Sequence, residues 1–383
     1  MVQRKKIIIL CSVIFLCLFL GRNYIYDMYV TNIMSVGMLS RENIEGKEKI
    51  IKNPTEIGML YNDSPVVFDE MTNTIYIPQN IYDKTWNGKI KTSKGKLGFE
   101  ENSFSKDKEE VIKEGHVFKL FWFDEKKYCE YNLIFSGMPI VSLQTQEILD
   151  ESQEVWAGTI EVYDVYRTSQ FYQKYDCVYN IRGASVRKFP KKSYKVELKD
   201  TKVSFLGMRS DDDWILNALY DDAGLVHNKV SMDVWKDISK YNSVKGDEGY
   251  DTEYVEVFLD GQYNGVYLLG ERVDEKQLEL KGNDILYKCR AMRIPEEHNY
   301  TNEETDDMPP IFLLKYPNED ISKNWEPIKK WVNCFLKFEV TDYETASQIL
   351  NMENAIDYNL YCLLIGGGDN TRKNVFFSRN VTL

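Results

Sequence analysis

The sequence predicts an α+β protein with a β-rich first part and a mixed second part. Between residues 59 and 150, short runs rich in β-branched and aromatic residues alternate with turn residues, and no helical period is sustained. From residue 153 onward, similar runs alternate with segments in which apolar residues recur every three or four positions, as in amphipathic helices. The length of 383 residues suits roughly two domains.

Residues 1–22 predict a membrane-targeting segment. A basic stretch, Arg4 to Lys6, precedes the apolar run Ile7–Leu20, the order found in signal peptides and short anchors. As a helix the run would be about 21 Å long, less than the roughly 30 Å hydrocarbon core, and the tyrosines that follow would extend it. Since no small-x-small cleavage site follows Leu20, we expect an uncleaved anchor with the body outside the cytoplasm. The alternative is a cleaved signal peptide and a protein secreted to the cell surface.

Residues 23–58 are polar and without a sustained period, which predicts a linker. Residues 59–150 predict a small β-rich domain that carries no catalytic constellation. Within it, residues 66–79 predict two strands around a Thr-Asn turn, and residues 89–100 predict a hairpin with Gly95 in its turn.

Residues 153–383 predict the domain that carries the chemistry. A hairpin over 253–275 has Asp260-Gly261 in its turn. Helices are expected over 225–240, 326–338 and 352–365, the last of them stopped by three consecutive glycines. In the first helix four apolar residues recur every four positions and predict one buried stripe: Val226, Val230, Val234 and Ile238.

Composition excludes several classes of function. The net charge of −12 argues against a general nucleic-acid binder, because affinity for polyanions depends on clustered Lys and Arg. The seven cysteines and three histidines show no metal-ligand spacing, and no GxSxG motif is present. A zinc enzyme or a histidine-based hydrolase is therefore not expected.

The basic turn, residues 180–198, is the densest charge feature in this acidic chain. It places six cationic side chains around one glycine and then alternates, so that Lys192 shares a face with Tyr194, Val196 and Leu198. A lysine that points inward beside a flexible basic turn predicts a phosphate site. Two alternatives are a plain basic hairpin whose Lys192 reaches water, and a site for anionic polymers or lipid headgroups.

A second candidate follows the last predicted helix. There the glycines lead into Asp369, four further residues, Asn374 and a strand. Protein kinases use the same spacing for the aspartate that accepts the hydroxyl proton and the asparagine that holds a magnesium ion. On spacing alone, ordinary turn chemistry is the simpler explanation of the loop.

Five segments taken together resemble the spore-coat protein H (CotH) family of atypical protein kinases. They are residues 181–194, 214–234, 255–274, 313–317 and 369–377. The resemblance covers roughly residues 155–383 and implies a distant protein-kinase-like fold. It also implies transfer of phosphate from ATP, with Mg²⁺, to Ser or Thr of a protein substrate.

The resemblance assigns roles residue by residue. It implies Asp369 as the catalytic aspartate and Asn374 as a metal ligand. Arg182, Arg187 and Lys192 fall on the family's basic motif, which implies contacts with the nucleotide phosphates; the choice between Lys191 and Lys192 stays open, and alternation favours Lys192. Glu271 is the candidate partner of that lysine, as in kinase Glu-Lys pairs, with a solvated strand-end charge as the alternative.

One departure concerns the C-terminal side. In the family a Trp-Asp-x-Asp segment with a second metal-binding aspartate follows the loop, and the printed chain reaches Leu383 before such a segment. We therefore expect a C-terminally truncated, incomplete kinase-like domain, which is either the product of a truncated reading frame or a fragment. In such a domain we expect ATP binding before turnover. The functional expectation is a membrane-anchored, extracytoplasmic CotH-like kinase. Its rival is a non-catalytic surface, adhesion or spore-coat structural protein that retains the fold.

Overall fold

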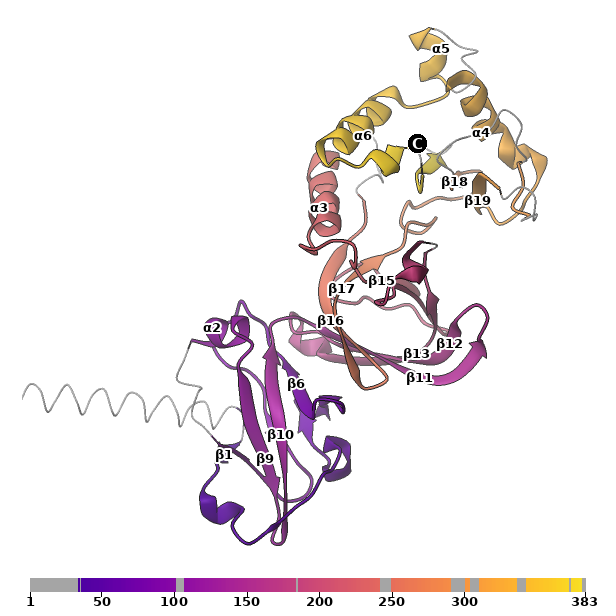
Figure 1. The fold of residues 1–383 in the computed structure, drawn as a ribbon. Coiled ribbons are helices and arrows are strands. Elements are labelled where there is room, and N and C mark those ends of the chain that lie inside the picture. The colour runs from indigo at the N-terminus through magenta and orange to yellow at the C-terminus, as the bar shows by residue number, and fades with distance from the viewer. Residues whose placement is uncertain are drawn as a thin grey trace, which may run out of the picture. The chain divides into compact units, whose positions relative to one another are not determined.

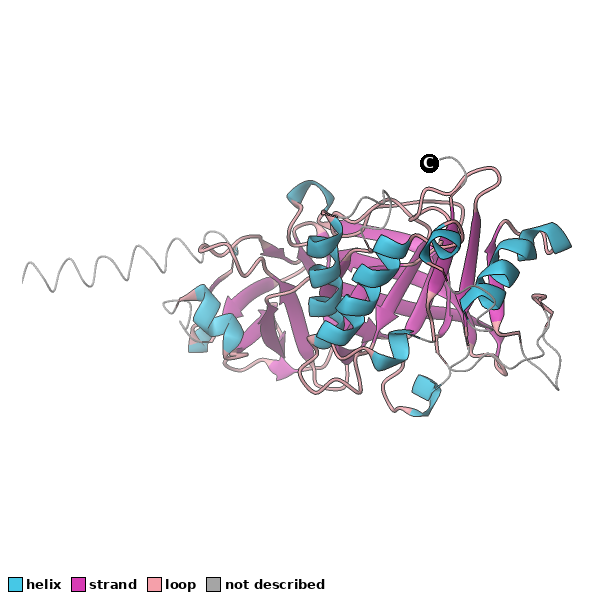
Figure 2. Cartoon of the chain, turned by 90° about the horizontal axis from the view of Figure 1, so that it is seen from above, coloured by secondary structure: helices cyan, strands magenta, loops and turns pink. Residues whose placement is uncertain are grey.

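The structure is a computed structural model, and it describes residue 34 and residues 36–100, 107–183, 185–241, 249–290, 300–303, 310–335, 342–371 and 373–380. Taken together, these residues form many strands and few helices, and both kinds of element are visible in Figure 2, so the expected α+β class is confirmed. The chain forms two compact units. The first contains Met1–Ala218 and Glu253–Leu269, and the second contains Leu219–Thr252 and Gly270–Leu383 (Figure 1).

The expected anchor, residues 1–22, lies outside the described residues. Among the residues that are described, no helix is both long enough and apolar enough to span a membrane.

The N-terminal part of the first unit is built on a seven-stranded sheet (Figure 1). Its strands run in the order β1-β8-β9-β10-β6-β5, and β2 pairs separately with β10. Alternate residues of β10, from Cys129 to Phe135, are buried, so one face of the sheet forms the core. The bounds are β1 Gly37–Met38, β2 Glu48–Lys49, β5 Val67–Asp69, β6 Thr74–Pro78, β8 Lys96–Phe99, β9 Val117–Phe123 and β10 Lys127–Ser136. A short helix, α2 Lys108–Lys113, belongs to the same part.

The two predictions for this part had different outcomes. The strand pair over 66–79 is confirmed, because β5 and β6 pair antiparallel and Asn73 in their turn has a positive φ of 52°. The prediction of a hairpin over 89–100 is wrong. β7 Ile90–Lys91 joins β3 Leu60–Tyr61 and β4 Ser64–Pro65 in a separate small sheet, while β8 pairs with β1 and β9. The strands around Gly95 thus find different partners, a choice that long-range pairing makes and local turn chemistry does not.

The rest of the first unit is a closed seven-stranded barrel in the order β11-β12-β13-β14-β15-β17-β16 (Figure 1). Apolar residues from every strand fill its interior, with Trp214 and Tyr267 among the largest buried side chains. Closure leaves no unpaired strand edge. The bounds are β11 Ile140–Asp150, β12 Val155–Tyr163, β13 Tyr172–Ile181, β14 Tyr194–Leu198, β15 Asp213–Asn217, β16 Thr252–Leu259 and β17 Gln262–Glu271.

Local turn chemistry was decisive for the β16–β17 hairpin. Asp260 and Gly261 have positive φ angles of 49° and 74°, which confirms the predicted two-residue turn. In β14 the predicted alternation also holds, since Tyr194, Val196 and Leu198 are buried.

The second unit combines four helices with a three-stranded sheet in the order β19-β18-β20 among its described residues. Helix α4 packs Trp325, Ile328 and Val332 against this sheet, while Trp331 and Phe335 of the same helix are only partly buried. The bounds are α3 His227–Ser239, α4 Ser322–Phe335, α5 Tyr343–Ser347, α6 Met352–Leu364, β18 Ile285–Cys289, β19 Phe312–Tyr316 and β20 Phe376–Arg379.

The stripe predicted along α3 is only half right. Val234 and Ile238 pack against the α3–α6 core, but Val226 and Val230 are 47% and 53% exposed. Trp235 sets the buried face instead, with its ring 5.0 Å from that of Tyr361 on α6, which lies beside α3 (Figure 1). A large aromatic side chain buries more area than a valine, so it determines which side of the helix faces its partner.

Candidate functional site

The basic turn connects β13 to β14 at one end of the barrel. The Arg182 amide donates to the Ser193 carbonyl at 2.8 Å, which continues the strand pairing into the turn. Arg187 lies in a short 3-10 helix, Ser185–Lys188, and its Nη2 donates to the Ile181 carbonyl at 3.1 Å. Its Nη1 forms an ion pair with Glu154. The Arg187 guanidinium therefore ties the turn both to its own strand and to the neighbouring β11–β12 turn.

The two adjacent lysines of the turn differ in environment. The Lys191 Nζ donates to the carbonyls of Ala218 and Val266 and lies 4.2 Å from the ring centroid of Tyr267. Burial lowers the pKa of Lys191. The Lys192 Nζ instead donates to the Arg187 carbonyl within the turn.

The prediction that Lys192 points inward is therefore wrong, and Lys191 is the lysine held against the barrel. The physical reason is that β14 begins at Tyr194, so its two-residue alternation does not extend back to Lys192. As a nucleotide contact, Lys192 stays a prediction, and its place in the turn leaves the ammonium group nearer to solvent.

The predicted Asp-x4-Asn loop is held from both ends in the second unit. Helix α6 ends at Leu364, and Gly366 follows with a left-handed φ of 67°, as expected for a glycine after a helix. A 3-10 turn, Gly368–Thr371, carries Asp369, whose carbonyl accepts the Lys373 amide at 2.8 Å. The loop therefore closes on itself around Asp369, and this side chain is exposed.

Asn374 is fixed by the sheet. Its amide donates to the Cys289 carbonyl at 2.8 Å, and the Cys289 amide donates to the Val375 carbonyl at the same distance. These bonds join the loop to the end of β18. Asn374 adopts a left-handed φ of 61°, a conformation that asparagine tolerates better than most residues. Asp369 and Asn374 thus lie at the two ends of one short, backbone-bonded loop.

Glu271 ends β17 and is 4% exposed. Its Oε2 accepts the Asp251 amide at 3.1 Å, and its own amide donates to the Asp251 carbonyl. Asp251 in turn pairs with Lys236. The alternative of a solvated strand-end charge is excluded by this burial, whereas pairing of Glu271 with Lys192 stays a prediction.

The six predicted residues fall into two groups. Arg182, Arg187 and Lys192 belong to the first unit, and the second unit contains Glu271, Asp369 and Asn374. Arg182, Arg187 and Lys192 share one turn, and Asp369 and Asn374 share one loop, whereas Glu271 contacts Asp251. A common nucleotide site for all six stays a prediction. No cluster of three or more His, Cys, Asp or Glu side chains suited to a metal occurs among the described residues. Asp369 and Asn374 offer oxygen donors, the type that Mg²⁺ prefers, and Mg²⁺ commonly takes few protein ligands besides phosphate.

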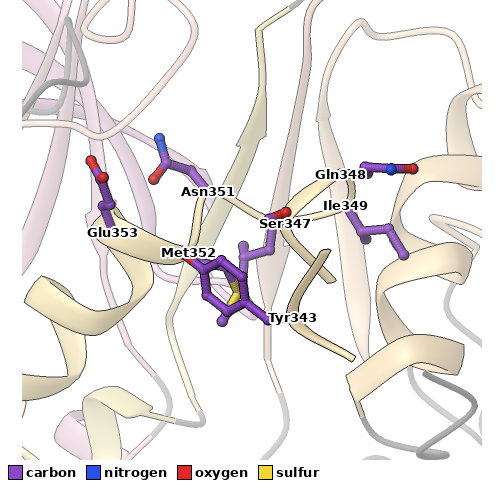
Figure 3. Close-up of a pocket in the computed structure, with 8 residues that line it drawn as sticks. Tyr343, Ser347, Gln348, Ile349, Asn351, Met352 and Glu353 are labelled. Atoms are coloured by element: carbon purple, nitrogen blue, oxygen red, sulfur yellow. The ribbon is translucent and has the colours of Figure 1, made fainter. Parts of the chain in front are cut away.

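A shallow hollow elsewhere in the second unit contains none of these residues (Figure 3). It lies where α5 leads into α6, and Figure 3 shows its lining side chains, which are Tyr343, Ser347, Gln348, Ile349, Leu350, Asn351, Met352 and Glu353. Glu353 is the one charged side chain in this lining, so the hollow holds no cluster of charges that indicates a reaction.

Comparison with known proteins identifies the domain that carries both groups. A sequence model of the family described as CotH kinase protein matches residues 179–382, more than half of the chain. The chain belongs to the CotH family. The inner spore coat protein H of Bacillus subtilis (strain 168) is 30% identical over 145 residues, which are 37% of this chain and 36% of that protein. The resemblance stated from the sequence is thereby confirmed, and the aligned stretch spans about a third of that relative.

All six predicted residues lie inside the region that matches the CotH family, and Glu154, the partner of Arg187, lies outside it. Sequence reasoning missed Glu154 and the contacts of Lys191. No local signal marks either, because both contacts join residues that are more than 25 positions apart in the chain.

Proposed function

We propose that this CotH-family chain is an ATP-dependent protein phosphotransferase with a distant kinase-like fold. Its substrates would be Ser or Thr residues of extracytoplasmic or coat proteins. The observation that carries the proposal is the Asp369–Asn374 loop, which is anchored between α6 and β20 within the region matched by the family. Rigid positioning of this kind is what phosphoryl transfer requires of a protein.

In the proposed reaction the hydroxyl oxygen of the acceptor attacks the γ-phosphorus of ATP, and the bond from that phosphorus to the bridging oxygen of ADP breaks. Asp369 accepts the proton of the hydroxyl. Arg182, Arg187 and Lys192 would neutralise the phosphate oxygens, for which guanidinium forks are well suited. Asn374 would hold Mg²⁺, which would supply neutralisation of the developing charge.

The direct test is transfer of radiolabelled phosphate from Mg-ATP by the full chain, with itself and casein as acceptors. We expect Asp369→Asn to lower the transfer rate by about 100-fold or more, since it removes the general base but keeps the shape. Asp237→Asn is the matched control, an exposed aspartate of α3 that pairs with Lys240. Equal labelling by the wild type and Asp369→Asn would contradict the assigned role.

A second candidate is a non-catalytic coat or surface protein that keeps the fold. The relative is an inner spore coat protein, which favours this candidate. A thermal-shift titration with Mg-ATP separates the two candidates. A stabilisation that Lys192→Ala abolishes supports the phosphotransferase, whereas no shift at any concentration supports the structural protein.

The proposed location follows from the same relative and from the N-terminal sequence. We place the protein in a coat or at the cell surface, with Ile7–Leu20 as a membrane anchor. Its proposed partner is a protein that bears Ser or Thr, and the net charge of −12 disfavours nucleic acid.

A further inference from the structure

We infer that the Glu154 carboxylate competes with phosphate for the Arg187 guanidinium and thereby lowers the affinity of the basic turn for phosphate. Glu154 ends the β11–β12 turn, and its Oε2 pairs with the Arg187 Nη1. The two side chains are 39% and 40% exposed, so the ion pair lies at the surface within reach of a dissolved anion. The inference rests on the proposed function only in taking the nucleotide as the natural anion.

The backbone places the Glu154 carboxylate beside the turn. The Glu154 carbonyl accepts the Ile181 amide at 3.4 Å, and the next residue, Val155, pairs with Asn180 at the start of the β12–β13 ladder. Glu154 therefore lies opposite the point where β13 leaves the sheet to become the basic turn. The position of Glu154 follows from strand register, so its negative charge is held close to the basic turn.

Both Nη groups of the Arg187 guanidinium are engaged. Nη1 contacts Glu154 and Nη2 donates to the Ile181 carbonyl. A phosphate that binds at the Nη1 side competes with the carboxylate, because both anions need the same donor and two anions at one cation repel each other. Binding of phosphate to Arg187 is consequently an exchange of one anion for another.

The exchange is energetically accessible. Partly exposed ion pairs change equilibrium constants by no more than about fivefold, so a multiply charged phosphate group can displace the carboxylate. After the exchange, the Glu154 charge still lies near the bound anion and weakens its binding. Removing that charge while keeping the side-chain shape should therefore tighten binding by about three- to tenfold.

The test is calorimetric titration of the full chain with sodium tripolyphosphate and, separately, with Mg-ATP. Glu154→Gln is compared with Glu151→Gln, an exposed glutamate in the same turn that changes the net charge equally. We expect about three- to tenfold tighter binding for Glu154→Gln and less than about twofold for Glu151→Gln. The gain should shrink at about 1 M salt, where the Debye length is about 3 Å, and should vanish in the Glu154→Gln, Arg187→Ala double variant.

Equal or weaker anion binding by Glu154→Gln would overturn the inference, because Glu154 would then only orient Arg187. If Glu154→Gln binds tripolyphosphate more tightly but no variant binds Mg-ATP, competition at Arg187 is supported and the proposed function fails. If Mg-ATP binds and the two glutamine variants behave alike, the proposed function stands and the inference fails. Absence of binding of either anion to every variant contradicts both.

Discussion

The Lys191 ammonium group lies over the Tyr267 ring, 4.2 Å from its centroid. Two carbonyls, from Ala218 directly after β15 and Val266 in β17, accept its hydrogen bonds. A partly buried ammonium group costs free energy unless it is hydrogen-bonded, and these contacts provide the compensation. Lys191 therefore joins the basic turn to the barrel strands that follow it, while Lys192 forms its hydrogen bond within the turn.

Replacing Lys191 by methionine should destabilise the protein by about 2 kcal/mol, because two carbonyls lose bonds to a charged donor. Lys192→Met should cost less than about 0.5 kcal/mol, as is usual for surface positions. Denaturant unfolding followed by tryptophan fluorescence measures both. Equal losses of unfolding free energy in the two variants would show that the Lys191 contacts stabilise the protein no more than those of Lys192.

The largely buried Glu256 of β16 predicts a pH dependence of stability. Burial raises the pKa of its carboxyl, and Tyr263 donates a hydrogen bond to its Oε1 at 3.3 Å. Tyr76 and Tyr263 are the other titratable groups nearby; burial raises the pKa of Tyr76 to about 12 and also raises that of Tyr263. Between the ordinary carboxyl pKa and the raised one, the native state binds more protons than the unfolded state. Stability should therefore fall as pH rises through this window.

Glu256→Gln should remove that dependence and stabilise the protein at neutral pH, since a neutral amide needs no charge in a buried site. Glu147→Gln, at an exposed position of β11, is the control and should leave the pH profile unchanged. Thermal unfolding measured from about pH 4 to pH 8 provides the comparison. An unaltered profile in Glu256→Gln would rule out this carboxyl as the source.

Asn374 allows the proposed metal ligand to be tested without backbone strain. Because its φ is 61°, which glycine adopts readily, Asn374→Gly keeps the loop conformation and removes the side chain together with its amide oxygen. We expect Asn374→Gly to raise the Mg²⁺ concentration needed for half-maximal stabilisation of the protein by ATP by about tenfold or more. Loss of even an indirect partner of a metal commonly costs that much affinity. Asn374→Asp retains an oxygen donor and should stay within about threefold of the wild type. The reverse order of the two variants would contradict a ligand role.

The α3–α6 contact predicts a large difference between two substitutions on one helix. Trp235→Ala should cost about 3–5 kcal/mol, because it leaves a cavity against Tyr361 and Cys362. Val230→Ala, at a position that is 53% exposed, should change stability by less than about 0.5 kcal/mol. Chemical denaturation of both variants tests which face of α3 is packed. Similar losses of unfolding free energy would favour the predicted valine stripe over the Trp235 face.

Features encoded by neighbouring residues could be predicted from the sequence. The Asp260-Gly261 turn, the alternation of β14, the helix 352–365 and its glycine stop all follow from local conformational preference. The family resemblance is of the same kind, because it rests on short contiguous motifs. The Asp369–Asn374 loop was found in this way, since its spacing and its glycines lie within a few residues of each other.

The sequence by itself determined the elements that local preference encodes, such as the β16–β17 hairpin and the helix over 352–365, and it determined the family. Only the tertiary structure decided their partners: that the strands around Gly95 join different sheets, that Trp235 sets the face of α3, and that Lys191 is held against the barrel. It also brought Glu154 to Arg187 across 33 positions of the chain. The physical reason is that pairing, burial and charge contact between distant segments depend on strand register and closure, and these are properties of the whole fold.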